Sequence, residues 1–132
     1  MFSRTRFPVL ALLAAVVALP ATALADSFGS SGELTRIVIY DSSSDDYSQK
    51  RGEVDIRTSG GSSTTYVWGG SKCNNMNLSS TNIRLLADVV NNADKTVTPR
   101  WKSGLGSTKC LVAFSIEEVE ERAAKSSNSR AR

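Results

Sequence analysis

The sequence contains no histidine and only two cysteines among its 132 residues. Histidine is the usual general base near neutral pH and a common metal ligand. Its absence therefore excludes Ser-His-Asp and Cys-His catalysis, and zinc sites with histidine ligands. Two cysteines cannot supply a four-cysteine zinc site or an iron–sulfur cluster within one chain. The length fits one domain at most.

The first 25 residues have the order of a secretory signal peptide. Arg4 and Arg6 form a positive segment without acidic residues, and the unbroken apolar run Val9–Leu19 follows. A run of this length is too short for a bilayer, which takes about 20 apolar residues. Small residues then lead to an expected cleavage between Ala25 and Asp26. We expect a secreted or periplasmic protein with no stable membrane insertion after cleavage; an uncleaved membrane anchor is the alternative.

Removal of this segment changes the charge of the chain. Residues 26–132 keep 14 of the 16 basic residues and all 13 acidic residues, so the net charge falls from +3 to +1. A nearly neutral domain gives no long-range attraction for polyanions, so no nucleic-acid partner is expected.

The two cysteines, Cys73 and Cys110, both lie in the exported part of the chain. In an oxidising compartment an even pair of cysteines indicates a disulfide bond. Two free thiols, or a bridge to another molecule, are the alternatives. A modest domain of this size has a small core, and a covalent link would stabilise it.

The pattern of apolar residues predicts an α+β fold. Alternation and β-branched residues indicate strands over residues 34–40, 53–58, 64–68, 96–102 and 109–116. A helix is expected between Ser79, which can cap its first turn, and the pair Asn91-Asn92. Short connections in the order β-β-β-α-β-β predict a mostly antiparallel, five-stranded sheet with the helix packed on one face. Pro99 lacks an N–H, so its strand should lie at an edge or carry a bulge.

The remaining segments divide the chain into regions. Residues 26–33 are rich in glycine and serine and are expected to be flexible, and residues 34–116 form the single globular domain. Residues 117–132 are charged, with few large apolar side chains, and are expected to form a largely disordered tail.

An aromatic and basic group of residues is the candidate binding surface. Aromatic side chains that are exposed can stack on a sugar ring or anchor a partner protein, whereas buried ones simply fill the core. Two cationic side chains on one strand face can meet a carboxylate or a phosphate, or they can discourage pairing between sheets. The group consists of Tyr66, Trp68, Arg100, Trp101 and Lys102.

No segment matches a metal, cofactor or catalytic motif. The acidic loop 41–52 has Asp46 where a calcium loop requires glycine, and Gly52 where it requires glutamate. The glycine-rich segment 103–109 lacks phosphate-loop spacing and is expected to be a turn. We therefore expect no metal, no cofactor and no catalytic residues. A carboxylate-dependent, glycan-active enzyme is the enzymatic alternative, and it requires two carboxyl groups facing one another across a cleft.

Three segments resemble small exported bacterial two-cysteine proteins of uncharacterised function. They are Tyr66-Val67-Trp68-Gly69-Gly70 with Cys73, residues 99–104 (PRWKSG) and residues 109–114 (KCLVAF), within a similarity that covers residues 34–116. The resemblance implies a secreted two-cysteine domain and no activity. The resulting hypothesis is a non-enzymatic domain that binds an unknown macromolecule at or outside the cell envelope. A secreted inhibitor that presents loop 41–52 or loop 69–77 is the alternative.

Overall fold

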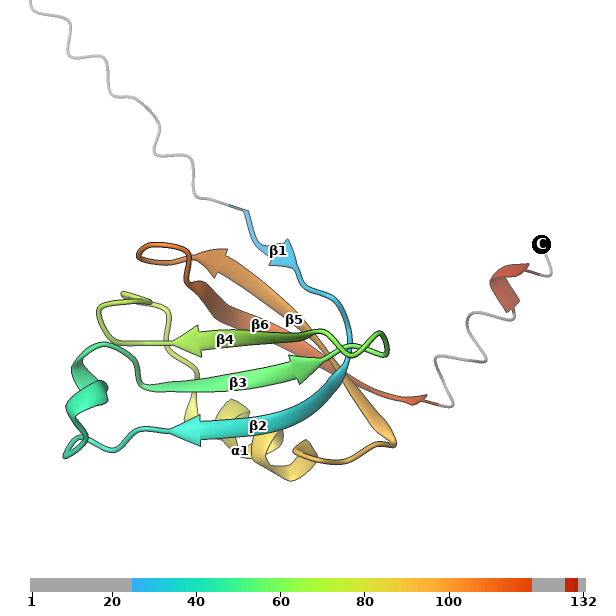
Figure 1. Cartoon of the computed structure of the whole chain (residues 1–132), viewed down its shortest axis with the longest axis horizontal. Helices are drawn as coiled ribbons and strands as arrows, with labels where there is room; N and C mark the ends of the chain where they lie inside the picture. Colours follow the sequence, from blue (N-terminus) through green and yellow to red (C-terminus); the bar gives the residue numbers. More distant parts are fainter. Residues whose placement is uncertain (1–24, 120–127, 131–132) are drawn as a thin grey trace, which may run out of the picture.

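The computed structural model describes residues 25–119 and 128–130, and a single sheet with one main helix forms the body (Figure 1). The expected signal peptide up to residue 24, and residues 120–127 and 131–132 of the expected tail, lie outside the described residues. The elements are β1 (Ser27–Phe28), β2 (Glu33–Ile39), the 3-10 turn η1 (Asp45–Ser48), β3 (Gly52–Arg57), β4 (Ser63–Trp68), α1 (Ser80–Val89), β5 (Lys95–Ser103) and β6 (Lys109–Glu118).

The α+β class is confirmed, but the five-stranded antiparallel sheet is wrong. The sheet has six strands in the order β1-β5-β6-β4-β3-β2, and it is mixed because β4 and β6 run parallel. The sixth strand, β1, lies within the 26–33 segment and pairs with β5. Short connections join β2 to β3, β3 to β4 and β5 to β6, which accounts for the antiparallel pairs. The parallel pair arises because α1 and β5 separate β4 from β6 along the chain.

The sheet curls until its two sides meet. Gly32, just before β2, donates a hydrogen bond to the Val97 carbonyl oxygen in β5 (3.1 Å) and accepts one from the Val97 N–H (2.8 Å). The segment 27–39 therefore pairs first with β5 and then with β3. Strand β5 returns after α1 to lie beside the start of β2, which is the Greek-key arrangement. The result is a small five-stranded barrel, with β1 as a short extension along the outer edge of β5.

Alternating side chains fill the interior of the barrel. Leu34, Val54, Ile56, Tyr66 and Trp68 are each at most 2% exposed and come from three adjacent strands. Helix α1 adds Leu86 and Val89, and further core residues come from β5 and β6. The Ser79 side chain accepts a hydrogen bond from the Asn82 N–H (3.2 Å), so the predicted helix cap is confirmed.

Strand β5 accommodates Pro99 because the backbone N–H that proline lacks is not needed for a hydrogen bond to β6. Its carbonyl oxygen accepts a hydrogen bond from the Gly29 N–H (2.9 Å), so the missing N–H of Pro99 faces the same outer edge. No ladder bond to β6 is lost. The ladder between β5 and β6 shifts register between Arg100 and Trp101, but the extra residue, Val112, lies on β6. The bulge is therefore not in the proline's own strand, and the short strand β1 on the other side of β5 accounts for the tolerance of Pro99.

The described part of the chain contains no helix that is long and apolar enough to cross a membrane.

Candidate functional site

Three loops meet at one end of the barrel, which we call the loop end. They are loop 40–51, loop 69–79 and loop 104–108, seen together at the left of Figure 1. Backbone hydrogen bonds join the first two loops: Ser71 N–H donates to Ser48 O (3.0 Å) and Lys72 N–H donates to Gln49 O (2.9 Å). Leu105 N–H donates to Lys72 O (2.9 Å) and joins the third. Segments far apart in the sequence thus form one surface.

Glycine at position 70 lets the first two loops approach closely. Gly70 has a φ of +67°, a conformation that residues with a side chain rarely adopt. A Cβ atom there would lie 2.3 Å from the backbone carbon of Gln49. The hydrogen bonds between the two loops therefore depend on this glycine.

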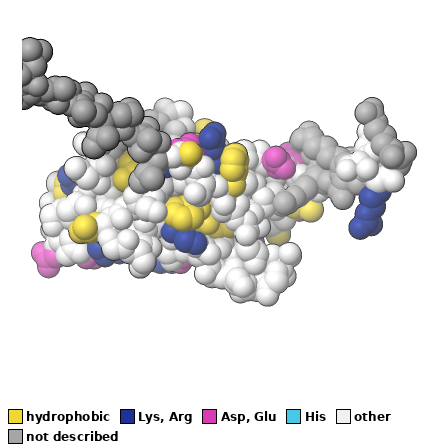
Figure 2. All heavy atoms as spheres, turned by 90° about the horizontal axis from the view of Figure 1, so that it is seen from above, with side chains coloured by type: hydrophobic (Ala, Val, Ile, Leu, Met, Phe, Trp, Pro, Cys, Tyr) yellow, Lys and Arg dark blue, Asp and Glu magenta, His cyan; other side chains and the backbone are white. Residues whose placement is uncertain are grey.

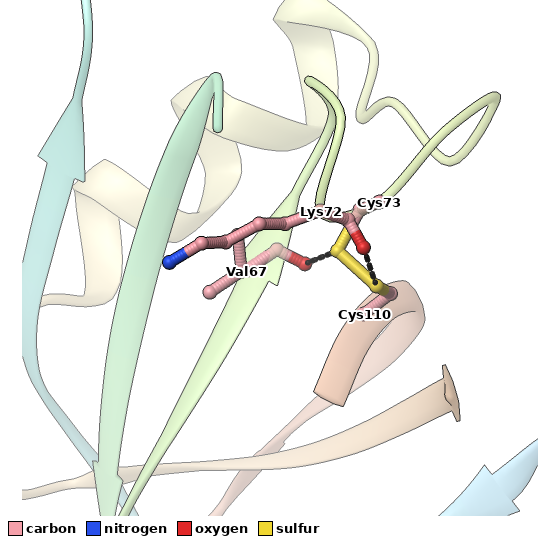
Figure 3. Close-up of a disulfide and its surroundings, with 4 residues drawn as sticks. All are labelled: Val67, Lys72, Cys73 and Cys110. Carbon is pink, nitrogen blue, oxygen red and sulfur yellow. Dashed lines mark hydrogen bonds between the residues drawn. A yellow bond between two sulfur atoms is a disulfide. The ribbon is translucent and has the colours of Figure 1, made fainter. Parts of the chain in front are cut away.

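The predicted disulfide between Cys73 and Cys110 is confirmed, and it lies at the base of the loop end. It ties loop 69–79 to the start of β6, with a Cα–Cα distance of 5.6 Å. Figure 3 shows the carbonyl oxygens of Val67 and Lys72 directed at the two sulfur atoms, each at 3.5 Å. Disulfide sulfurs carry no proton, so these are packing contacts. Both cysteines are fully buried, and with Val67 and Met76 they form a second small core outside the barrel.

A shallow groove of about 360 Å³ runs between the second and third loops. Leu105 projects at its rim with 69% of its surface exposed, and Met76 lies in the groove beside the second small core. The groove combines apolar contact with neutral polar groups. Lys72 contributes its carbonyl oxygen next to Leu105, while its side chain runs away from Cys110 (Figure 3). Its lining consists of Ser71, Lys72, Asn74, Met76, Ser103, Gly104 and Leu105.

The sequence did not identify Leu105 as a residue of the candidate binding surface. The segment Ser103-Gly104-Leu105-Gly106-Ser107 is a turn, as predicted from its glycines. A large apolar residue in a solvent-exposed turn contributes nothing to the core, and single exposed leucines are common. The useful signal was the position of the turn next to Cys110, because the disulfide places this leucine beside loop 69–79.

The structure does not bring the five predicted surface residues together. Tyr66 and Trp68 are 2% and 1% exposed and belong to the core, so they form no binding surface; burial also raises the pKa of Tyr66. Trp101 is half-buried against the core, with Lys109 Nζ 5.0 Å from its ring centre.

Arg100 and Lys102 contact the chain's own β1. The carboxylate of Asp26 lies 3.1 Å from Arg100 Nη2 and 3.5 Å from Lys102 Nζ. The Arg100 guanidinium also lies over the Phe28 ring, 5.0 Å from its centre. These two cations thus meet a carboxylate, as the sequence allowed, but the carboxylate is internal. Their role in the described structure is to hold β1 on β5.

The outer face of β2, β3 and β4 carries a network of ion pairs. Arg36 donates to Asp55 Oδ2 through Nε (2.6 Å) and to Glu53 Oε1 through Nη2 (2.7 Å). Lys50 Nζ lies 2.5 Å from Glu53 Oε2, and Thr65 donates to Asp55 (2.6 Å). Burial opposes ionisation of both carboxyl groups. Hydrogen bonds from Lys50 and Arg36 outweigh this effect and lower the pKa of Glu53, and those from Arg36 and Thr65 lower the pKa of Asp55.

Glu53 and Asp55 are two described carboxylates that share one cation, so they bear on the alternative of a glycan-active enzyme. Arg36 binds both, and their lowered pKa values keep both ionised at neutral pH. Neither can then donate a proton to a leaving group. Among the described residues no group of three or more His, Cys, Asp or Glu side chains is arranged to hold a metal ion.

The ion-pair network makes stability depend on acid pH. The folded protein binds fewer protons at Glu53 and Asp55 than the unfolded chain, so this contribution is present at neutral pH. It is lost as the pH falls below about 4. We expect Arg36→Met to lower the free energy of unfolding by about 1–2 kcal/mol at pH 7, and by less at pH 3. Urea unfolding at both pH values measures this. Arg84→Met, on the exposed side of α1, is the control, and an equal loss at both pH values would contradict the assignment.

No family model, no curated protein and no solved structure matches this chain.

Proposed function

We propose that this chain is an exported, non-enzymatic domain that binds another macromolecule at or outside the cell envelope through its loop end. The observation that carries the proposal is the joining of three loops by backbone hydrogen bonds and a buried disulfide around an exposed leucine. A surface fixed in advance loses less conformational entropy on binding than a flexible one. The apolar run at residues 9–19 and the disulfide support export.

The arrangement of the barrel supports the same surface. A five-stranded, partly open Greek-key barrel is the architecture of the OB-fold, which binds ligands on one sheet face and on the loops between its first and second and between its fourth and fifth strands. Counting along the barrel of this chain, those loops are 40–51 and 104–108. This is an analogy of architecture, and it supports the location of the surface rather than the identity of a ligand.

The chemistry of the groove indicates the kind of contact that a partner makes. Leu105 and Met76 offer apolar surface to one side chain of the partner, and Ser71, Asn74 and Ser103 offer neutral polar groups beside it. Interfaces of this type place an apolar anchor at the centre and polar groups at the rim. A partner with an apolar side chain flanked by hydrogen-bonding groups fits this groove.

A secreted inhibitor is the second candidate. The disulfide that fixes loop 69–79 favours an inhibitor, because a loop that enters the cleft of an enzyme must keep its shape. Met76 of that loop packs against the second small core, so the exposed large apolar side chain at the loop end is Leu105. An inhibitor would differ from a simple binding domain in one respect: the captured partner would be an enzyme, and binding would lower its activity.

Site-specific photo-crosslinking tests the proposed function. A photoreactive phenylalanine analogue replaces Leu105 at the loop end or, as a matched control, Leu85 on α1; both leucines are exposed, at 69% and 46%. In envelope fractions of the producing cell we expect a discrete adduct from position 105 and none from position 85. Excess unlabelled chain should compete, and a Leu105→Asp chain should compete poorly because it places a charge on the apolar contact. Adducts from position 85 alone, or from neither position, would overturn the proposal.

A further inference from the structure

A hollow of about 570 Å³ lies at the other end of the barrel from the loop end. It is formed where the turn between β3 and β4 approaches the start of β2, the start of β5 and the end of β6, at the right of Figure 1. This volume is within the range of small-molecule sites, about 300–1,000 Å³. The hollow is separate from the groove at the loop end, since the two share no lining residue.

The walls of the hollow carry hydroxyl groups and one ion pair. Ser31, Thr58 and Thr96 contribute hydroxyls, each of which already contacts a neighbouring oxygen of the protein. A hydroxyl has one donor and two acceptor positions, so each keeps capacity for a ligand. Arg57 Nη2 lies 3.0 Å from Glu33 Oε2 at the rim. The guanidinium has five N–H donors and the carboxylate accepts at two oxygens, so both retain free positions.

The charges of the hollow cancel, which selects against ions. One carboxylate and one guanidinium leave no net charge on the lining, and the other lining groups are neutral. A ligand that fits must be neutral and must both donate and accept hydrogen bonds at many points. Neighbouring hydroxyl groups on a sugar ring meet this requirement, because each donates to a carboxylate and accepts from a guanidinium or a hydroxyl.

A second hollow, of about 340 Å³, shares Val119 with the first. It also carries a cation and a carboxylate in contact, Lys95 and Glu118 at 3.1 Å. Asn92 and Asp94 complete its lining, so this hollow has one more carboxylate than cations. Val119 is 44% exposed and offers an apolar contact between the two hollows. A ligand with two similar polar units joined together matches this repeated arrangement better than a single compact molecule.

We propose that this end of the barrel binds a neutral oligosaccharide, with one sugar unit in the hollow beside Arg57 and Glu33 and the next across Val119. The site is independent of the proposed partner at the loop end. Both hollows are shallow, and their described linings contain no aromatic ring on which a sugar could stack. The affinity for a disaccharide is therefore expected to be weak, with a Kd on the order of 1 mM.

Nuclear magnetic resonance titration of the full chain tests the proposal. Cellobiose and diacetylchitobiose are the probes, and glycine is the control for a zwitterion that Arg57 and Glu33 would bind instead. We expect saturable shifts of the backbone amides of Gly32, Gly61 and Thr96 with one or both saccharides, and none with glycine. Thr96→Val removes a wall hydroxyl at nearly constant volume and should weaken binding about tenfold.

The variant comparison separates a built site from surface adsorption. Thr81→Val, on the exposed first turn of α1, should bind as the unmodified chain does. A correctly folded Thr96→Val chain has the same amide spectrum away from the hollow, so loss of binding is distinguishable from loss of structure. Shifts that do not saturate, shifts on other surfaces, stronger binding of glycine, or equal binding by Thr96→Val would each overturn the proposal.

Discussion

Replacing Cys73 and Cys110 together by alanine is expected to lower the free energy of unfolding by about 4 kcal/mol. The bond closes a segment with a sequence separation of 37, and the chain-entropy relation for a loop of this length gives that figure. Most domains are stable by only about 5–15 kcal/mol, so the loss is a large share of the total. Chemical denaturation of the oxidised chain and of the double-alanine variant measures it.

Reduction of the unmodified chain is the companion measurement. Both cysteines are fully buried, so a mild reductant should act slowly until the protein unfolds, and the reduced chain should then match the double variant in stability. A loss well below 2 kcal/mol in both experiments would mean that hydrogen bonds between the loops keep the loop end folded without the disulfide.

Trp68→Ala is expected to cost about 3–5 kcal/mol, in the range of large-to-small substitutions of buried aromatic residues. The indole is 1% exposed, inside the barrel. Trp101→Ala is the matched control. Trp101 lies at the margin of the same core and is half-buried, so its loss should be clearly smaller. Thermal or urea unfolding of both variants measures the difference, and equal losses would contradict the assignment of Trp68 alone to the interior.

Gly52 provides a sharper test of the same packing. It pairs with Trp68 across the ladder, and a Cβ atom at position 52 would lie 2.0 Å from the indole ring. Gly52→Ala should therefore destabilise the protein by about 1–3 kcal/mol through overpacking. Combined with Trp68→Leu, which makes room, the same change should cost less. Additive losses in this double-mutant cycle would show that the two residues do not share a space.

Local elements follow well from the sequence because their determinants are local. Alternation of apolar residues located all five long strands, and Ser79 caps the helix as predicted. Each of these features depends on residues that lie close together in the sequence.

Strand order could not be derived in the same way. Strand β6 lies between β4 and β5 and pairs with β4 at Val67 and Cys110, although α1 and β5 intervene in the sequence. Strand β1 has only two residues, and its place depends on Asp26 meeting Arg100 and Lys102 far along the chain. Such contacts carry no periodic signal, and connection length alone favours neighbours in sequence.

Alternation of apolar and polar residues also does not show which face of a strand points into the core. Tyr66 and Trp68 share a face by their spacing, but spacing does not say whether that face is inside or outside. Gly52 opposite Trp68 was the available signal, since a glycine across from a large ring makes room for it. The candidate surface could not be predicted for a related reason: it joins three loops through backbone groups, which the identity of side chains does not reveal.

Amide hydrogen exchange of the oxidised chain tests most directly whether the three loops form one fixed surface. Ser71, Lys72 and Leu105 lie outside the strands, yet each donates its N–H to a carbonyl of another loop. We expect these amides to exchange nearly as slowly as those of β3, and far more slowly than Gly61, whose N–H bonds only within its own turn. Reduction of the disulfide should speed exchange at Lys72 and Leu105 first. If the three amides exchange as fast as Gly61 in the oxidised protein, the loop end is not preformed, and the binding surface proposed for it is contradicted.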